Sequence, residues 1–182
     1  MDTKDILLHA ALKVFATNGY HGSSVSDIAK QAKVSKALFY HYFESKKDLL
    51  VIFAKRRLEE WTPLIEKLET IKNPKERISF LIDFVLNELE TKADWLRFLY
   101  MLYLSTEGIE AIQEAMGKYK EQFNRLFTAE RQLYKDLGYA DPDDEATYLR
   151  SVLQGISLEY LLSGKNYPLH NMKEKIIKRY LS

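Results

Sequence analysis

The sequence predicts an all-α protein in which a three-helix head precedes a larger helical bundle, with about nine helices in total. Apolar residues recur at helical spacing, and no segment alternates apolar and polar residues as a strand does. Each of the four prolines stands where a helix can begin, because a first turn does not need the missing N–H group. Only seven glycines interrupt the 182 residues, so the connections between helices are short.

The composition is typical of a globular chain with enough apolar residues for one large core or two small ones. Hydrophobic residues make up 46% of the chain and charged residues 29%. Cysteine is absent, which excludes disulfides, thiolate metal sites and cysteine nucleophiles. The longest apolar run, residues 98–104, is too short to cross a membrane, and the polar residues 1–5 do not resemble a signal peptide. We therefore expect a cytoplasmic protein without a membrane partner.

Positive charge is concentrated in one segment, although the net charge of the chain is only +1. Residues 30–57 contain eight lysines and arginines against two acidic residues, whereas residues 58–182 carry a net charge of −4. A basic block on an otherwise acidic chain is typical of a surface that binds a polyanion. A solvated helix face is the alternative that charge alone leaves open.

The first two helices of the head are predicted from an apolar stripe and from their caps. Residues 3–18 place apolar side chains on one face, and Gly19 then allows the left-handed conformation that ends a helix. Ser24 and Asp27 have the spacing of a capping box, which predicts a short helix over residues 25–32.

A tight turn at residues 33–35 separates that helix from another short one at residues 36–43. Phe39 and Phe43 lie on one face of this helix and are interpreted as core. A second capping-box spacing, from Ser45 to Asp48, begins a longer helix that runs to about residue 61. Helices this short are not stable separately, so the head must share one core.

Two short helices joined by three residues form a helix-turn-helix pattern. The segment from Ile6 to Phe53 resembles the TetR family of transcriptional regulators. The residues that carry the resemblance are Phe15, Gly19-Tyr20, Ser24 to Ala29, Val34-Ser35-Lys36 and Phe39 to Phe43, followed by Ser45 to Leu49. The resemblance covers about a quarter of the chain. It implies a DNA-binding domain at residues 1–46 and a ligand-binding and dimerisation domain at residues 47–182.

The resemblance also implies which residues meet double-stranded DNA. The start of the second short helix would enter the major groove, with Lys36 at a guanine edge and Leu38 at a thymine methyl group. Ser24, Tyr42 and Lys46 would bind phosphates. The predicted DNA-binding residues are Ser24, Ser26, Ser35, Lys36, Ala37, Leu38, Tyr40, His41, Tyr42, Lys46 and Lys47. The alternatives are that the serines are only helix caps and that the two tyrosines are partly packed.

One residue departs from the family pattern, because Lys33 stands in the turn where members of the family commonly have glycine. A non-glycine residue at positive φ costs about 1 kcal/mol, so we expect a mildly strained or slightly reshaped turn. Ala37 and Leu38 also replace the Gly-Thr often found there, which leaves the base preference open.

The rest of the chain is predicted to form helices rich in aromatic residues. Three helices are expected over residues 75–137, the last of them running from about 109 to 137. Aromatic rings between helices can line a cavity for an apolar ligand, although they more often fill a core. Because the resemblance implies an effector-binding domain, the predicted ligand-binding residues are Trp95, Phe98, Tyr103, Phe123, Phe127 and Tyr160.

The last two helices are expected at about residues 142–163 and 168–181. Gly155 in the middle of the first costs about 1 kcal/mol relative to alanine unless another helix approaches closely. The resemblance implies dimerisation through these helices, and packing within one subunit is the alternative.

Together these features predict a homodimeric transcriptional regulator, a repressor that binds a palindromic operator and is released by a small, largely apolar effector. The helix from residue 45 to about 61 is the expected lever between the two sites. We predict no catalytic residue, metal or cofactor, because the sequence has no metal-binding box, phosphate-binding glycine loop or activated nucleophile. The alternatives are a DNA-binding regulator without an effector and, from another class, an all-α enzyme or carrier.

Overall fold

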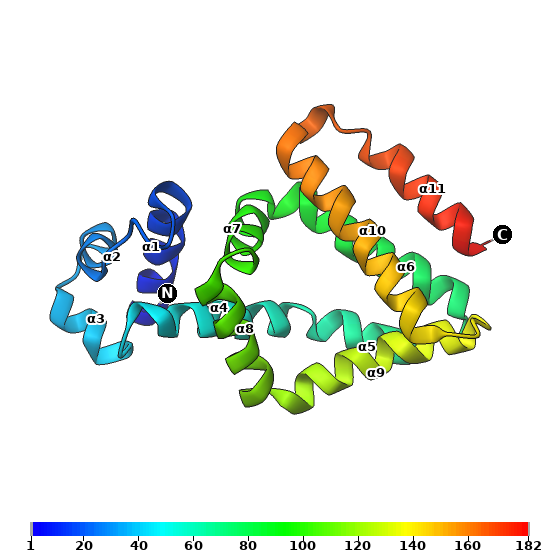
Figure 1. Ribbon diagram of the computed structural model, residues 1–182, viewed down its shortest axis with the longest axis horizontal. Helices are drawn as coiled ribbons and strands as arrows, with labels where there is room; N and C mark the ends of the chain where they lie inside the picture. The colour runs from blue at the N-terminus through cyan, green and yellow to red at the C-terminus, as the bar shows by residue number, and fades with distance from the viewer. Residues whose placement is uncertain (1, 182) are drawn as a thin grey trace. The chain divides into compact units, whose positions relative to one another are not determined.

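The computed structural model describes residues 2–181, and in that range it contains helices and no strands (Figure 1). Eleven α-helices and one short 3₁₀ helix, η1 (Gly164–Asn166), follow one another over these residues, which confirms the all-α prediction. None of the helices described is both long and apolar enough to cross a bilayer. The contacts within the chain divide it into two compact units.

Unit 1 comprises the chain up to Arg57 together with Asp94–Tyr119. It holds the head helices and two helices from the middle of the sequence. Its elements are α1 (Thr3–Asn18), α2 (Val25–Ala32), α3 (Lys36–Tyr42), the first four-fifths of α4 (Lys46–Glu60), nearly all of α7 (Ala93–Tyr103) and α8 (Thr106–Lys118). The predicted three-helix head is therefore present and packs with α7 and α8 in one body. The expected functional boundary between residues 46 and 47 lies inside this body and stays a prediction.

The core of unit 1 is built around aromatic rings from three helices. Phe53 of α4 lies edge-on to Phe98 of α7, with the ring centroids 5.1 Å apart. Phe98 also stacks on Phe15 of α1 at 6.0 Å and on Trp95 at 5.6 Å. Edge-to-face and offset-stacked rings at these separations stabilise a core beyond the area that they bury. This cluster joins helices that are far apart in the sequence.

Side-chain caps begin the helices of the head as the sequence predicts. The backbone N–H of Asp27 donates to Ser24 Oγ at 3.1 Å, and the N–H of Ser24 donates back to Asp27 Oδ2 at 2.9 Å. The same reciprocal pair forms between Ser45 and Asp48 at the start of α4. The C-terminus of α1 is capped by Gly19, whose φ is 72°. Both predicted capping boxes are thus confirmed.

Unit 2 comprises Leu58–Ala93 and the chain from Lys120 onward. Its helices are α5 (Thr62–Thr70), α6 (Pro74–Thr91), α9 (Lys120–Asp136), α10 (Pro142–Ser163) and α11 (Leu169–Leu181). The helix α6 contacts all four of the others and buries Ile78, Ile82 and Leu89. Buried Arg77 at its first turns forms an ion pair with Asp136 at the end of α9.

The described residues contain eleven α-helices, two more than the nine or so predicted. One of the predicted helices is in fact two helices, and one helix was not predicted. A single helix was expected over residues 109–137, but the chain breaks at Tyr119, where φ is −118° and ψ is 37°. The apolar spacing continues through this point, yet α8 packs in unit 1 and α9 packs in unit 2. The other addition is α5, which begins after α4 ends and carries Pro63 in its first turn.

Candidate nucleic-acid interface

The turn between α2 and α3 contains the one residue other than glycine, among residues 2–181, that has a positive φ. Lys33 adopts the left-handed conformation, with φ at 57° and ψ at 40°. Its N–H donates to Lys30 O at 3.1 Å, and the N–H of Val34 donates to Ala29 O at 3.0 Å. These bonds satisfy the last carbonyls of α2 in the manner of a Schellman motif. The strained form of the turn, expected from the lysine in place of glycine, is therefore present.

Lys33→Gly is expected to raise the free energy of unfolding by about 1 kcal/mol, or to leave it unchanged, because glycine adopts this conformation without a Cβ penalty. Urea denaturation of both proteins measures the difference. The flexibility that glycine adds to the unfolded chain offsets part of the gain. A fall in both melting temperature and DNA affinity would refute the strain interpretation and indicate that the Lys33 side chain binds DNA.

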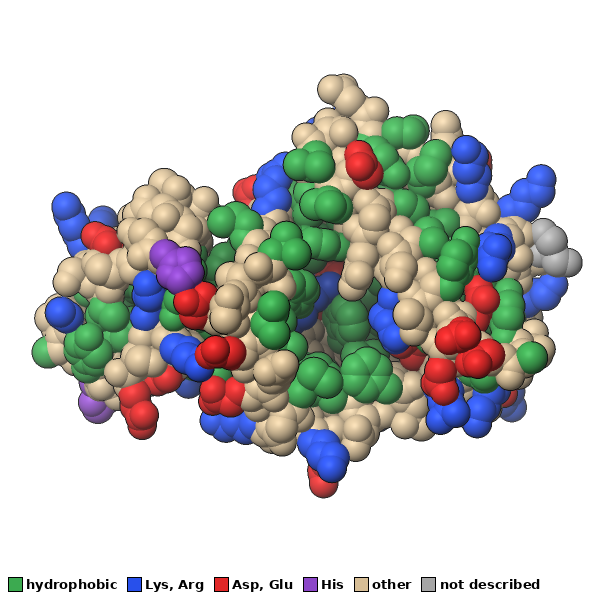
Figure 2. Space-filling view, viewed as in Figure 1, with side chains coloured by type: hydrophobic (Ala, Val, Ile, Leu, Met, Phe, Trp, Pro, Cys, Tyr) green, Lys and Arg blue, Asp and Glu red, His purple; other side chains and the backbone are tan. Residues whose placement is uncertain are grey.

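The helix α3 buries one side and presents the other to solvent. Phe39 is fully buried and contacts Phe43, with the ring centroids 5.2 Å apart. Lys36, Ala37 and His41 are exposed, and Tyr40 keeps 50% of its surface accessible. Lysine and arginine side chains and hydrophobic side chains both reach the surface over α2 and α3 on the face seen in Figure 2. Thus α3 has one anchored face and one face that is available to a ligand.

Tyr40 and Tyr42 belong to the exposed set, together with a cationic neighbour. Lys36 Nζ lies 5.9 Å from the centroid of the Tyr40 ring, one helical turn away. Tyr42 is exposed, and its ring lies edge-on to that of His41 at 5.0 Å. Leu38 is half-buried. Tyr40 and Tyr42 are thus accessible, but their rings also lie against Phe39 and Phe43, so the alternative of partly packed tyrosines stays open.

The serines at this surface cap helices and remain accessible. Ser24 Oγ donates to Asp27 Oδ2 at 2.6 Å, and Ser35 Oγ accepts the N–H of Leu38 at 3.1 Å. Ser26 is exposed in the first turn of α2. The hydroxyl of Ser24, followed by its backbone N–H, lowers the pKa of Asp27 by donating to the carboxylate. The capping box therefore contributes stability at neutral pH and loses it as pH falls through the folded-state pKa.

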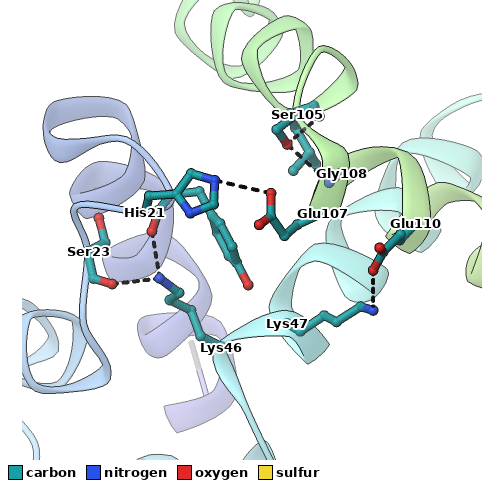
Figure 3. A network of polar contacts seen from close by, with 10 residues as sticks. His21, Ser23, Lys46, Lys47, Ser105, Glu107, Gly108 and Glu110 are labelled. Carbon is teal, nitrogen blue, oxygen red and sulfur yellow. Dashed lines mark hydrogen bonds and ion pairs between the residues drawn. The ribbon is translucent and has the colours of Figure 1, made fainter.

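The two lysines that open α4 have different partners (Figure 3). Lys46 Nζ donates to Tyr20 O at 2.6 Å and to Ser23 O at 2.7 Å. Burial lowers the pKa of Lys46, because desolvation disfavours the charged ammonium. Lys47 Nζ instead forms an exposed ion pair with Glu110 Oε2 of α8 at 2.8 Å. The hydrogen bond that Lys47 donates to Glu110 within this ion pair is the main cause of the raised pKa of Lys47.

The first turns of α8 supply acidic side chains that sequence reasoning missed. Glu107 Oε2 lies 3.2 Å from His21 Nε2, and Glu110 pairs with Lys47 as described above (Figure 3). The available signal was a pair of glutamates three residues apart near a helix N-terminus. That spacing predicts a shared helix face but does not say which segment lies opposite.

The segment that carries this geometry also matches a known family. Residues 7–51 match the family model described as bacterial regulatory proteins of the tetR family. In this segment the chain is therefore similar to the TetR family. The match covers α1 to α3 and the first part of α4, which is where the sequence resemblance lies.

Two proteins similar to this chain are named as regulators. The fatty acid metabolism regulator protein of Bacillus subtilis (strain 168) is 36% identical over 77 residues, which cover 42% of this chain and 40% of that protein. The HTH-type transcriptional regulator HbdR of Aromatoleum sp. (strain CIB) is 27% identical over 141 residues, covering 76% of this chain and 60% of the relative. The matched residues thus span about half the length of these two relatives.

A solved structure extends the likeness of fold to the whole chain. The transcriptional regulator FadR from Bacillus subtilis, in complex with stearoyl-CoA, superposes with a TM-score of 0.79 at 20% sequence identity. The superposition covers 98% of both chains. The two relatives and this structural neighbour are transcriptional regulators and not enzymes, and the absence of a catalytic residue from this chain stays a prediction.

The six predicted ligand-binding residues divide between the two units. In unit 1, Trp95 and Phe98 belong to the aromatic core, and Tyr103 is half-buried near the end of α7. In unit 2, Phe123 and Phe127 stack on α9 with ring centroids 6.3 Å apart. Tyr160 of α10 lines a separate surface groove of about 570 Å³ together with Glu90, Lys165 and residues 167–171. Within each unit the structure brings together one aromatic pair, and the binding role of all six residues stays a prediction.

Proposed function

We propose that this chain is a TetR-family transcriptional regulator that binds double-stranded DNA by placing α3 in the major groove. The observation that carries the proposal is the exposed face of α3, on which Lys36 and Ala37 are followed one turn later by Tyr40 and His41. Buried Phe39 holds the helix from behind, so this face is rigidly presented. A helix of this kind, preceded by a second helix and a tight turn, is the element that reads base edges in helix-turn-helix proteins.

Each exposed residue has a proposed role that suits its chemistry. Lys36 donates to the O6 and N7 atoms of guanine, and Leu38 contacts a thymine methyl group. The hydroxyl of Tyr42 and the ammonium of Lys47 bind phosphates. Ser24 binds a phosphate by exchanging the hydrogen bond that its hydroxyl donates to Asp27. The remaining members of the proposed interface are Ser26, Ser35, Ala37, Tyr40 and His41. We also propose the cytoplasmic location that the sequence predicts.

Lys36→Ala is expected to weaken binding by about 1–3 kcal/mol on the duplex that the wild-type protein selects from a random-sequence library. The loss on duplexes of random sequence is expected to be much smaller, because a base contact matters only at its own base pair. Fluorescence anisotropy with both duplexes measures the difference. Lys118→Ala at the exposed end of α8 removes an equal charge and serves as the control. Equal losses on the two duplexes would contradict the proposed base contact.

We also propose that the regulator is a homodimer that reads a palindromic operator through two copies of α3. The support within unit 2 is an apolar stripe on α10 that no other part of that unit covers. Leu158 and Leu162 are 43% and 74% exposed, and a Cβ atom added to Gly155 would meet nothing within 4 Å. A stripe that includes a small residue suits close approach of the same helix from a second copy.

Leu158→Glu is expected to raise the dissociation constant of the dimer by about tenfold or more, since it places a charge in the apolar contact. Sedimentation equilibrium over a range of protein concentrations measures this change. Leu104→Glu is the matched control, because Leu104 is also an exposed leucine but follows α7. A dimer that is unaffected by Leu158→Glu, or a monomeric wild-type protein, would overturn the proposed interface.

The effector that we propose is a molecule with a long apolar chain, whose binding releases the repressor from its operator. Two observations support it. One relative is named a fatty acid metabolism regulator and one structural neighbour was solved with stearoyl-CoA. In addition, α9 exposes the apolar ring of Phe127 beside Phe123. Binding of the effector and of the operator must then weaken each other by the same factor. The alternative without an effector requires no such coupling.

Titration with stearoyl-CoA tests the effector proposal, with coenzyme A alone as the control for the headgroup. The fluorescence of Trp61 and Trp95 follows occupancy, and operator anisotropy follows release. We expect acyl-chain binding to weaken operator affinity by about 5- to 150-fold, the usual range of allosteric coupling. Occupancy without any change in operator affinity would refute the switch but leave DNA binding intact.

A further inference from the structure

Two successive lysines at the start of α4 reach partners of opposite kinds. The ammonium of Lys46 is held by backbone carbonyls of the segment between α1 and α2, whereas that of Lys47 faces a carboxylate of α8. Both residues are predicted to bind phosphate, and their charges are equal. The two lysines differ in the groups that surround their ammonium groups in unit 1.

The hydrogen-bonding capacity of Lys46 is already used inside the protein. An ammonium group has three N–H donors and no acceptor. Two of the donors are taken by Tyr20 O at 2.6 Å and Ser23 O at 2.7 Å, and the Tyr20 ring centroid lies 4.1 Å from Nζ. A phosphate can therefore reach at most the one remaining donor, beside the Tyr20 ring, unless it displaces short charge-assisted hydrogen bonds. The side chain is therefore committed to the fold of unit 1.

One of the two carbonyls that Lys46 binds, that of Ser23, lies directly before the N-cap of α2. Ser23 is buried, and its Oγ donates to Gly19 O at 2.6 Å, which ties it to the end of α1. The next residue, Ser24, caps α2 and is part of the proposed phosphate-binding surface. Through Ser23, the side chain of Lys46 connects the first turn of α4 to the first turn of α2.

The surroundings of Lys47 leave room for exchange of its partner. Lys47 and Glu110 both lie at the surface, where an ion pair contributes little stability and is screened by salt. A phosphodiester of DNA accepts the same kind of hydrogen bond and, like a carboxylate, carries one negative charge, to which the neighbouring phosphates of the duplex add their attraction. A DNA phosphate can therefore replace Glu110 as the partner of Lys47 with little loss of free energy.

We infer that the two lysines divide the work of DNA binding: Lys46 is a positioning residue that holds the N-terminus of α2 against α4, and Lys47 is the phosphate ligand, occupied by Glu110 when DNA is absent. The inference rests on the proposed DNA binding. It assigns to Lys46 a role different from the phosphate contact that the family resemblance implies.

The salt dependence of DNA binding distinguishes the two roles. Each phosphate that a lysine neutralises contributes about 0.9 to the slope of log K against log salt concentration. For Lys47→Met we expect weaker binding and a slope smaller by about 0.9. For Lys46→Met we expect an affinity loss of about tenfold at every salt concentration with the slope unchanged, because the contacts that it positions are made by neutral groups. Lys118→Met is the charge control.

Two further variants test the assigned partners. Lys46→Arg is expected to restore most of the affinity, because a guanidinium group can also donate to two carbonyl oxygens. Glu110→Gln is expected to raise affinity for duplexes of random sequence by about two- to fivefold, since Lys47 no longer has to leave an ion pair. All affinities are measured well below the melting temperature of each variant, so that the folded fraction is the same.

Every outcome of this experiment bears on the inference. A smaller slope for Lys46→Met would show that Lys46 binds phosphate after all. Unchanged affinity for this variant at a temperature where it is folded would reduce Lys46 to a stabilising residue. An unchanged slope for Lys47→Met would remove Lys47 as the ligand. If the wild-type protein binds no duplex, the proposed function itself fails.

Discussion

Phe98→Ala is expected to lower the free energy of unfolding by about 3–5 kcal/mol, the usual loss when a fully packed phenylalanine is truncated. The ring is only 3% exposed and is surrounded by the rings of Phe15, Phe53 and Trp95. Its removal leaves a cavity among three helices of unit 1, and rigid aromatic neighbours cannot collapse fully into it. Guanidinium denaturation followed by circular dichroism measures the effect.

The matched control is Phe127→Ala, because Phe127 belongs to the same set of predicted ligand-binding aromatics but is 42% exposed on α9. Its truncation is expected to cost less than about 1 kcal/mol of stability, since much of the ring already faces water. If Phe98→Ala were as mild as Phe127→Ala, the ring would line a space that a ligand fills, and its interpretation as core would be wrong.

Gly108→Ala is expected to destabilise the protein by about 1–3 kcal/mol, or more if the backbone cannot move. A Cβ atom at this position would lie 1.8 Å from the carbonyl oxygen of Leu102 and 2.8 Å from Ser105 Oγ. The backbone at Gly108 is also held in position, because its N–H donates to Ser105 Oγ at 3.0 Å in the N-terminal cap of α8. Thermal denaturation measures the loss as a lower melting temperature.

The control for this variant lies in the same helix. A Cβ atom added to Gly117 would meet nothing within 4 Å, so Gly117→Ala tests helix propensity without a steric conflict. It is expected to leave stability unchanged or to raise it by up to about 1 kcal/mol. Equal effects of the two substitutions would mean that the approach of α8 to the Leu102 carbonyl is not tight.

Local spacing sufficed to predict the elements of the head. The capping boxes at Ser24 and Ser45, the helix end at Gly19 and the unusual turn at Lys33 all follow from interactions within a few residues. Such interactions have the same geometry in any fold, so sequence patterns indicate them directly. The exposed face of α3 follows in the same way, because burial of Phe39 leaves the rest of a short helix outside.

The partners of a helix face depend on contacts between distant segments, which spacing does not encode. An aromatic stripe predicted Phe98 as part of a ligand cavity, and its burial beside Phe15 and Phe53 emerged only when α7 was seen in unit 1. Likewise, two adjacent lysines look alike in the sequence, yet the carbonyls around Lys46 and the carboxylate beside Lys47 give them different chemistry. Periodicity specifies which side chains share a face, and only the packing of the whole chain specifies what that face meets.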